Sequence, residues 1–453
     1  MVKVQGAQLV DGVGAPLQLR GVNRSGGEFA CSVTGASPNR GYSIWDGPRY
    51  DAPNVSQPPE MAVAMLSWGI NAVRIPINAN CWTNQPANSF NPAFAGAAYR
   101  QAVIDYIDQL GAAGIYVIVD LHAVSGGAYP NFEASILPMP DSVDGPAAWA
   151  GVAGALKDRT HVVYDLYNEP NFWELGGAPP YATQWACWAG GCMIDPNGPA
   201  PAYQTAGMQA LVNAVRSTGS TQPLMLGGIG YASILGAQWP AHVPNDPAKS
   251  LIASFHNYPA PVGGCTDEAC WNASIATIRD AGYPVVTGEV GQFECGHDYL
   301  KRYLTWADAR NISYLAWTWN ETNPPSSWTC AGPSVIRSYD GTPTESYGRA
   351  YRDHLLARLA QVDRTPPNTV KRAGPKKRTK KRKVKFKFAS TEPGSRFECK
   401  LDRERYASCR SPVKRKVKPG KHKFLARAID AAGNVDPTPA RWKFKVKPRG
   451  GAR

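Results

Sequence analysis

Two glutamates stand where short apolar runs of the sequence end. Glu169 follows the run 162–167 in the stretch HVVYDLYNEPN (161–171), whose β-branched and aromatic residues are typical of a buried parallel strand that stops before proline. Glu289 closes a second such run, 283–289. A buried carboxylate is costly unless it is paired or used, and two of them are the minimum for hydrolysis of a glycosidic bond. The alternative is that each glutamate caps a neighbouring helix or pairs with an arginine.

The elements that must position these glutamates alternate along roughly the first 350 residues. Strand-like runs occur at 17–23, 71–76, 115–122, 162–167, 223–228, 251–258, 283–289 and 312–319. Helical spacing of apolar residues occurs at 58–69, 99–113, 202–217, 272–281 and 298–310. Eight strands alternating with helical stretches predict an α/β fold, the (β/α)8 TIM barrel. The rival, an open dinucleotide-binding sheet, would show a glycine-rich phosphate turn, which the sequence lacks.

Polar and aromatic side chains gather at the predicted carboxyl ends of these strands, where active sites of such barrels lie. Only the fifth strand, which ends in two glycines, has none. Each residue alone has a structural explanation, such as an ion pair for the arginine or a core position for a histidine or tryptophan. Together they predict one site, and its candidates are Asn23, Arg74, His122, Asn168, Glu169, His256, Tyr258, Glu289, Trp317 and Trp319.

In these residues the sequence resembles glycoside hydrolase family 5, the cellulase family, over roughly residues 3–350. The functional pattern of that family is an arginine, a histidine, Asn-Glu-Pro, His-x-Tyr, a second glutamate and a tryptophan. The tryptophan match leaves a choice between Trp317 and Trp319. The other matching positions, in order, are Arg74, His122, Asn168-Glu169-Pro170, His256-Asn257-Tyr258 and Glu289.

The resemblance implies a retaining mechanism that needs no metal and no organic cofactor. Glu289 would attack the anomeric carbon, and Glu169 would protonate the leaving oxygen and then activate water, with the two carboxyl groups about 5–5.5 Å apart. For the acid role Glu169 needs a raised pKa, to which the nearby charge of Glu289 would contribute. Substrate-binding or bracing roles fall to Arg74 and Tyr258, which would hold Glu289, and to Asn168, His122, His256 and Trp317, which would meet the sugar or brace the carboxylates.

The charge is distributed unevenly along the 453 residues, which total +14. Residues 364–453 hold 30 Lys and Arg against 6 Asp and Glu, a net charge of +24, and the rest of the chain is at −10. A Pro-Pro pair near this shift indicates a linker. We therefore predict a barrel domain over 1–362, a linker over 363–376 and a basic domain over 377–453.

In the basic domain, residues 383–388 and 441–447 alternate strictly between basic and apolar, which predicts half-buried strands. The segments 397–402 and 428–434 resemble immunoglobulin-like sandwich modules of bacterial surface proteins. The tract KKRTKKRK (376–383) admits three interpretations: a solvated charged face, adhesion to an anionic cell-surface or wall polymer, or nucleic-acid binding. We regard nucleic acid as the weakest of these, because a disulfide-bearing hydrolase has no evident role with it.

The chain contains ten cysteines, several in close pairs, and no C-x2-C pair of the kind that binds zinc. Disulfides in a secreted protein are the better interpretation, although no charged and then apolar leader precedes the first strand and no run is apolar enough to span a membrane. Spacing leaves connectivity open. The pairs we expect are Cys31–Cys81, Cys187–Cys192, Cys265–Cys270, Cys295–Cys330 and Cys399–Cys409, the last also implied by the immunoglobulin-like resemblance.

The expected activity is that of a secreted retaining hydrolase of β-1,4-linked polysaccharide, most simply an endo-β-1,4-glucanase. A β-mannanase or an exo-acting β-glucosidase on the same scaffold is an alternative, because the residues named above do not choose the sugar. A protein of another class, a non-catalytic carbohydrate- or surface-binding protein on the same barrel, would need neither glutamate. The oligomeric state does not follow from the sequence.

Overall fold

A computed structural model of the chain describes residues 1–31, 58–85, 92–124, 137–172, 179–195, 202–259, 265–292, 296–321, 334–363, 365–430 and 433–448. Contacts divide the chain into two compact units. One comprises Met1–Met61 and Asn71–Tyr351, and the other Ala62–Ile70 and Arg352–Arg453. No helix in the described ranges is long and apolar enough to cross a membrane.

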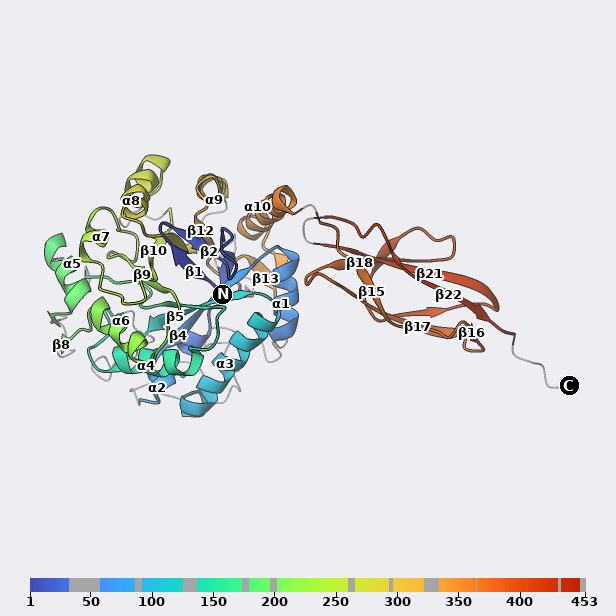
Figure 1. The fold of residues 1–453 in the computed structure, drawn as a ribbon, viewed down its shortest axis with the longest axis horizontal. Helices are drawn as coiled ribbons and strands as arrows, with labels where there is room; N and C mark the ends of the chain where they lie inside the picture. Colours follow the sequence, from blue (N-terminus) through green and yellow to red (C-terminus); the bar gives the residue numbers. More distant parts are fainter. Residues whose placement is uncertain are drawn as a thin grey trace. The chain divides into compact units, whose positions relative to one another are not determined.

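Eight parallel strands close into a barrel in the first part of the chain, which confirms the predicted TIM-barrel fold (Figure 1). Each predicted strand is present, and every residue of the four strands β4, β6, β10 and β11 is buried, as the continuous apolar runs require. Around the barrel the strands are β3 (Arg20–Asn23), β4 (Ala72–Asn78), β5 (Tyr116–Ala123), β6 (Val162–Asp165), β9 (Leu224–Gly227), β10 (Leu251–Asn257), β11 (Val285–Val290) and β12 (Ser313–Ala316).

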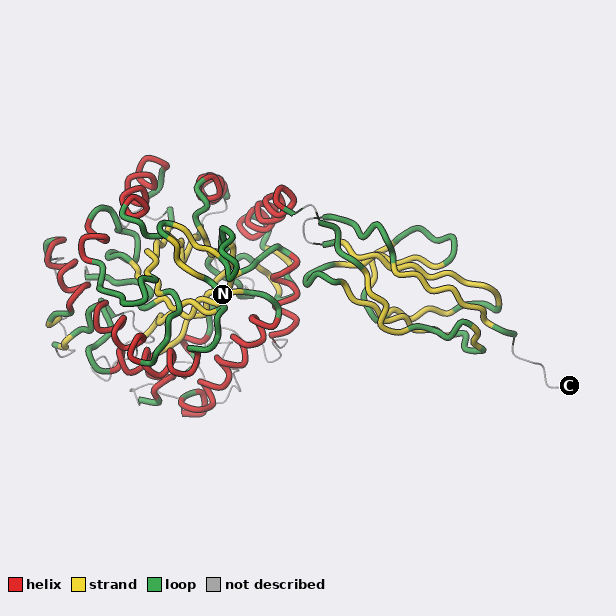
Figure 2. Tube along the Cα trace, in the orientation of Figure 1, coloured by secondary structure: helices red, strands yellow, loops and turns green. Residues whose placement is uncertain are grey.

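Helices surround this barrel (Figure 2). Four of the five predicted helices are confirmed, and the fifth prediction was partly wrong: Tyr203–Gln204 (β8) pairs with Met193–Ile194 (β7), so α6 begins only at Met208. The helices are α1 (Pro58–Ser67), α2 (Ala79–Thr83), α3 (Gly96–Ala112), α4 (Asp144–Leu156), α5 (Tyr181–Gly190), α6 (Met208–Ser217), α7 (Gln238–His242), α8 (Glu268–Asp280), α9 (Asp298–Ala309) and α10 (Tyr347–Val362).

The amino-terminal end of the barrel is filled by side chains, one from each strand or the residue just before it. The hairpin of β1 (Lys3–Gln5) and β2 (Gln8–Val10) closes this end, because Val2 and Leu9 join the same apolar cluster. The interior is therefore a packed core, which leaves the carboxyl ends of the strands to carry polar groups. The strand residues of the cluster are Leu19, Ala72, Ile118, Val163, Met225, Ile252, Val286 and Leu315.

Two β-sheets that share one apolar core make up the carboxy-terminal part. One sheet has the order β15-β17-β20 and the other β16-β22-β21-β18-β19. Strand β15 lies within 363–376, the range that the sequence analysis assigned to the linker. The predicted domain boundaries and the immunoglobulin-like assignment stay predictions. The strands are β15 (Thr369–Ala373), β16 (Arg378–Thr379), β17 (Lys383–Ser390), β18 (Arg396–Leu401), β19 (Ala407–Cys409), β20 (Val413–Lys416), β21 (Gly420–Ile429) and β22 (Ala440–Val446).

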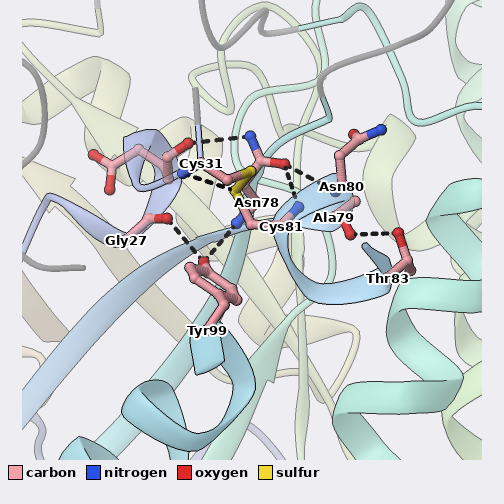
Figure 3. The surroundings of a disulfide bond; sticks show 9 residues. Gly27, Cys31, Asn78, Ala79, Asn80, Cys81, Thr83 and Tyr99 are labelled. Carbon is pink, nitrogen blue, oxygen red and sulfur yellow. Dashed lines mark hydrogen bonds between the residues drawn. A yellow bond between two sulfur atoms is a disulfide. The ribbon is translucent and has the colours of Figure 1, made fainter. Parts of the chain in front are cut away.

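Four of the five expected disulfides are present: Cys31–Cys81, Cys187–Cys192, Cys265–Cys270 and Cys399–Cys409. The fifth, Cys295–Cys330, lies outside the described residues. Three of the four close short loops within one region of the chain. The exception, Cys31–Cys81, joins the segment after β3 to helix α2 across 50 residues (Figure 3).

Phe386 is the centre of the core between the two carboxy-terminal sheets. Its ring is fully buried and lies 3.9 Å from the ring of Phe424, with an angle of 11° between them. We expect Phe386→Ala to lower the free energy of unfolding of this part by about 3–5 kcal/mol, because it leaves a cavity. Hydrogen exchange of the β17–β22 amides in the full chain measures the loss, and Phe386→Leu should lose less. Unchanged protection in Phe386→Ala would contradict this core.

Candidate active site

Eight of the ten candidate residues, those that match the family pattern with Trp317 as its tryptophan, meet at the carboxyl ends of the barrel strands. Each is joined to another by a hydrogen bond or ring contact, so the structure brings the whole set together. Arg74 lies on β4, His122 on β5, His256 on β10 and Glu289 on β11, while Asn168, Glu169, Tyr258 and Trp317 follow the ends of β6, β10 and β12.

The Arg74 guanidinium is the hub of this site, and it is fully buried in the middle of β4. Burial alone would lower its pKa, but the charges of Asp120, Asp165 and Glu289 outweigh this and raise it, so Arg74 stays charged. Its four hydrogen-bond acceptors are Glu289 Oε1 and Asn168 Oδ1 at 2.8 Å, and Asp165 Oδ2 and Asn23 Oδ1 at 3.0 Å. Asp120 Oδ1 adds an ion pair at 2.9 Å.

Asp120 and Asp165 are functional residues that the sequence analysis missed. Both are fully buried and lie against Arg74, so they neutralise a cation that would otherwise be too costly to bury. Burial raises the pKa of Asp165 to about 7 despite Arg74, and the charge of Asp120 adds to this. A charged residue within an otherwise apolar strand was the signal for both, as in the run 115–122.

Glu169 follows β6 and is the less buried of the two glutamates, with 16% of its side chain exposed against 5% for Glu289. His256 Nδ1 lies 2.9 Å from Glu169 Oε1. Burial raises the pKa of Glu169 to about 7, although His122 and Arg74 pull it down. Burial is therefore the main cause of the raised pKa, and the charge of Glu289, which the sequence analysis expected to contribute, is not among its main causes.

Glu289 is held from two sides, as the resemblance implied. Arg74 donates to Oε1 at 2.8 Å and the Tyr258 hydroxyl donates to Oε2 at 2.7 Å. Charge-assisted hydrogen bonds of this kind stabilise and orient a carboxylate. One oxygen of Glu289, one of Glu169 and a ring nitrogen of His256 all lie within 4.8 Å of one another.

His122 differs from His256 in its protonation state. Burial alone would lower its pKa, but Asp120, with its oxygen 2.7 Å from Nδ1, and Glu28 and Glu289 raise it to about 9. For His256, burial lowers the pKa to about 4. At neutral pH the site therefore contains one imidazolium and one neutral imidazole, and the neutral ring can donate its Nδ1 proton to Glu169.

Trp317 stacks on His122, with ring centroids 5.3 Å apart and 17° between the planes. It is partly exposed, whereas Trp319 is fully buried. An indole that meets a sugar ring must have a free face, so the structure favours Trp317 over Trp319 for the role that the sequence left between them.

A short turn after β3 brings a further carboxylate toward His122. Glu28, in the 3-10 turn Gly27–Phe29, is fully buried, and burial raises its pKa although the His122 charge and hydrogen bonds from Ser25 and Gly26 lower it. Figure 3 shows how this turn is held. Asn78 donates to the Glu28 carbonyl at 3.1 Å, Tyr99 donates to the Gly27 carbonyl at 2.8 Å, and the Cys31–Cys81 disulfide lies beside them.

Among the residues that the structure describes, two groups have spacing that would also suit a metal ion. Glu169, His256 and Glu289 form one, and Asp363, Glu392 and Asp430 in the carboxy-terminal unit form the other. In the first group the hydrogen bond between His256 and Glu169 and the two donors to Glu289 already account for the spacing. The expectation that the chemistry needs no metal stays a prediction.

A closed barrel with two glutamates at the carboxyl ends of its strands is the architecture of barrel glycosidases. The chain matches cellulase (glycosyl hydrolase family 5) over residues 14–323. It therefore belongs to this family.

Individual relatives are distant. The endoglucanase MaCel5A of Microbulbifer sp. (strain ALW1) is 23% identical over 235 residues, which cover 50% of this chain and 38% of that protein. The chain thus spans little more than a third of that relative's length. Among solved structures, the hyperthermophilic endocellulase of the archaeon Pyrococcus horikoshii is 19% identical, with a TM-score of 0.54 over 78% of this chain and 98% of that one. XacCel5A in complex with cellopentaose is 17% identical, with a TM-score of 0.50 over 75% and 99%.

The two site histidines should titrate far apart. We expect His122 to be protonated at pH 7 and to lose its proton near pH 9, and His256 to be neutral and to gain one only near pH 4. Nitrogen-15 NMR of the imidazole rings measures both. Asp120→Asn should lower the pKa of His122, because it removes the charge that faces Nδ1. Two histidines titrating together near pH 6.5 would contradict the described electrostatics.

Proposed function

We propose that the protein is a retaining endo-β-1,4-glucanase that cleaves by double displacement. The observation that supports this most is the close approach of Glu169 and Glu289, whose nearest oxygens lie within 4.8 Å. Retaining glycosidases hold their carboxyl groups about 5–5.5 Å apart, whereas inverting enzymes need about 6.5–9.5 Å to admit a water. The short spacing supports direct attack by one carboxylate on the sugar.

In the first step Glu289 attacks the anomeric carbon and forms a glycosyl-enzyme. Arg74 and Tyr258 orient its carboxylate, which leaves the attacking oxygen fixed and stripped of water. Glu169, whose raised pKa of about 7 allows it to hold a proton at neutral pH, donates that proton to the leaving oxygen. The glycosidic bond breaks as the bond to Glu289 forms, so the leaving chain departs as an alcohol.

In the second step Glu169, now ionised, removes a proton from water, which attacks the anomeric carbon and releases Glu289. Formation of the ester removes the negative charge of Glu289, and hydrolysis restores it. The neutral His256 can donate to Glu169 while that group is ionised, and it stays neutral throughout because burial keeps its pKa low. The net configuration at the anomeric carbon is retained.

The remaining site residues are suited to binding the sugar. Asn168 accepts from Arg74 through Oδ1, and its amide nitrogen lies 3.5 Å from His122 Nε2. Both nitrogens carry N–H groups when His122 is protonated, so a sugar hydroxyl can accept from either. Such a contact to the 2-hydroxyl strengthens in the transition state. Trp317 offers an apolar face to a pyranose ring, and the His122 cation that it covers can donate to sugar oxygens.

The choice of β-1,4-glucan is supported by the relatives. MaCel5A and the Pyrococcus horikoshii protein are an endoglucanase and an endocellulase, and XacCel5A was solved with cellopentaose. We further propose that the protein acts outside the cell, because its four described disulfides suit an oxidising compartment.

Substitution of the two glutamates should have different, substrate-dependent effects. We expect Glu289→Gln to abolish cleavage of every substrate, because no nucleophile remains. Glu169→Gln should slow cleavage of carboxymethyl cellulose about 10²–10⁴-fold, the usual loss without a general acid. It should slow formation of the glycosyl-enzyme from dinitrophenyl β-cellobioside much less, since that leaving group needs no proton. Reducing-sugar release and the dinitrophenolate burst measure these rates.

The substrate assignment needs its own comparison. Mixed-linkage β-glucan, glucomannan, mannan, xylan and an aryl β-glucoside serve as the panel. Rapid cleavage of the glucans alone would support the endoglucanase. Faster cleavage of mannan, or of the aryl glucoside only, would replace it with the corresponding enzyme, and no cleavage by the folded protein would remove the catalytic proposal.

The pH dependence should report the proton on Glu169. Because the acid must be protonated and its pKa is raised to about 7, kcat/KM on cello-oligosaccharides should fall as the pH rises above about 7. With dinitrophenyl β-cellobioside this alkaline limb should disappear. An alkaline limb with the same midpoint for both substrates would assign it to a group other than Glu169.

A further inference from the structure

The sheet β15-β17-β20 presents a surface that contains cations and no anions. Its three strands include no Asp or Glu at all. Five exposed lysines, which we call the lysine face, project from the side opposite the core. They are Lys383, Lys385 and Lys387 of β17 and Lys414 and Lys416 of β20.

Strand alternation fixes the direction of these side chains. In β17 the residues between the lysines, Val384, Phe386 and Phe388, are buried in the core between the sheets. Successive side chains of a strand point to opposite faces, so the three lysines share the outer face at intervals of about 6.6–6.8 Å. Their position is therefore set by the same packing that forms the sheet.

The register places like charges directly opposite each other. Lys383 pairs with Lys416, and Lys385 pairs with Lys414. Directly opposed side chains have Cβ atoms about 4.5–5.5 Å apart, and like charges in that position are destabilising. None of these four lysines forms an ion pair within the described part of the chain. The arrangement costs stability in the isolated protein.

Ordinary explanations do not account for this cost. Lysines often protect exposed sheet edges from pairing with other chains, but β17, which carries three of the five, is the central strand of its sheet. Solubility needs a net charge of only about 2–8 on a small domain, far below the +24 of residues 364–453. The second sheet also opposes lysines, Lys421 to Lys445 and Lys423 to Lys443, but its strands include Glu398, which pairs with Arg427 at 2.7 Å.

We propose that the lysine face binds a polysaccharide that carries carboxylate groups. A regular array of cations about 5 Å apart across the sheet and about 6.7 Å apart along it is complementary to a linear polymer with repeated anionic groups. Binding would neutralise the opposed lysine pairs, so it recovers the stability that the free protein lacks. The proposal concerns the carboxy-terminal sheets and does not depend on glucanase activity.

The side chains of this face favour a polysaccharide over nucleic acid. Single-stranded nucleic acid binds to grooves in which bases stack on aromatic side chains, and the only aromatic residues of these strands, Phe386 and Phe388, are buried. Lysine is a point charge that can bind carboxylate or phosphate, so the preference is based on the burial of these aromatic residues. The chain also belongs to a family of polysaccharide hydrolases, so an acidic polysaccharide is a polymer that it can meet beside its substrate.

The full-length protein and immobilised polygalacturonate test this proposal. We expect binding that weakens steeply between about 50 and about 200 mM salt, and an affinity at least about 10-fold lower in Lys385→Gln/Lys387→Gln/Lys414→Gln. The same three positions changed to Arg should retain binding. The variants should melt no earlier than the parent chain, because the substitutions remove or keep charges without touching the core.

The matched control is a triple variant of the barrel that loses the same three positive charges as the lysine-face variant. Lys157→Gln/Lys301→Gln/Arg302→Gln replaces three exposed cations of helices α4 and α9 or their ends, and it should bind within about 2-fold of the parent chain because none of the three belongs to the lysine face. An equal loss of affinity in both triple variants would show that binding depends only on net charge, which would overturn the proposed site. Tighter binding of duplex DNA than of polygalacturonate, or no binding of polygalacturonate at low salt, would overturn the proposed ligand.

Discussion

The buried guanidinium of Arg74 is the interaction on which the rest of the site depends. A fully buried cation is tolerated only when carboxylates and further acceptors surround it, and strands β3, β4, β5, β6 and β11 each direct a group to this point. Arg74 therefore links the closure of the barrel to the position of Glu289. The chemistry requires an oriented carboxylate with little water around it, and the barrel supplies that by burying one cation among Asp120, Asp165 and Glu289.

Burial also separates the charge states of groups that are chemically alike. Glu169 and Glu289 are both glutamates, but only Glu289 receives hydrogen bonds from Arg74 and Tyr258, whereas Glu169 faces a neutral histidine and has its pKa raised by burial. His122 and His256 diverge in the same way, since Asp120 faces the first and the second is mainly desolvated. Each pair of identical side chains can thus perform two different tasks in one site.

The sequence predicted the eight strands, because runs of β-branched residues are local signals. It also predicted that the polar residues at the strand ends meet, although their catalytic and binding roles stay predictions. Asp120 and Asp165 were missed because their role depends on Arg74, which is distant in the sequence. Helix α4 was missed because alanine and glycine also fill its outer face, which masks the helical spacing of Trp149, Val152 and Leu156. Trp317 and Trp319 were inseparable on the assumption of a continuous strand, but β12 ends at Ala316, so alternation does not apply beyond it. The lysine pairing needs the register of β17 and β20, which strand patterns alone do not give.

Covalent labelling tests most directly that the Arg74 array prepares Glu289 as the nucleophile. A 2-deoxy-2-fluoro-β-cellobioside with a dinitrophenolate leaving group should inactivate the enzyme and add one cellobiosyl mass. Peptide mapping should place that mass on Glu289, and Arg74→Lys should label far more slowly, because the three N–H groups of a lysine cannot serve all four hydrogen-bond acceptors of Arg74. A label on another residue, or equal labelling rates in the parent chain and Arg74→Lys, would contradict the account.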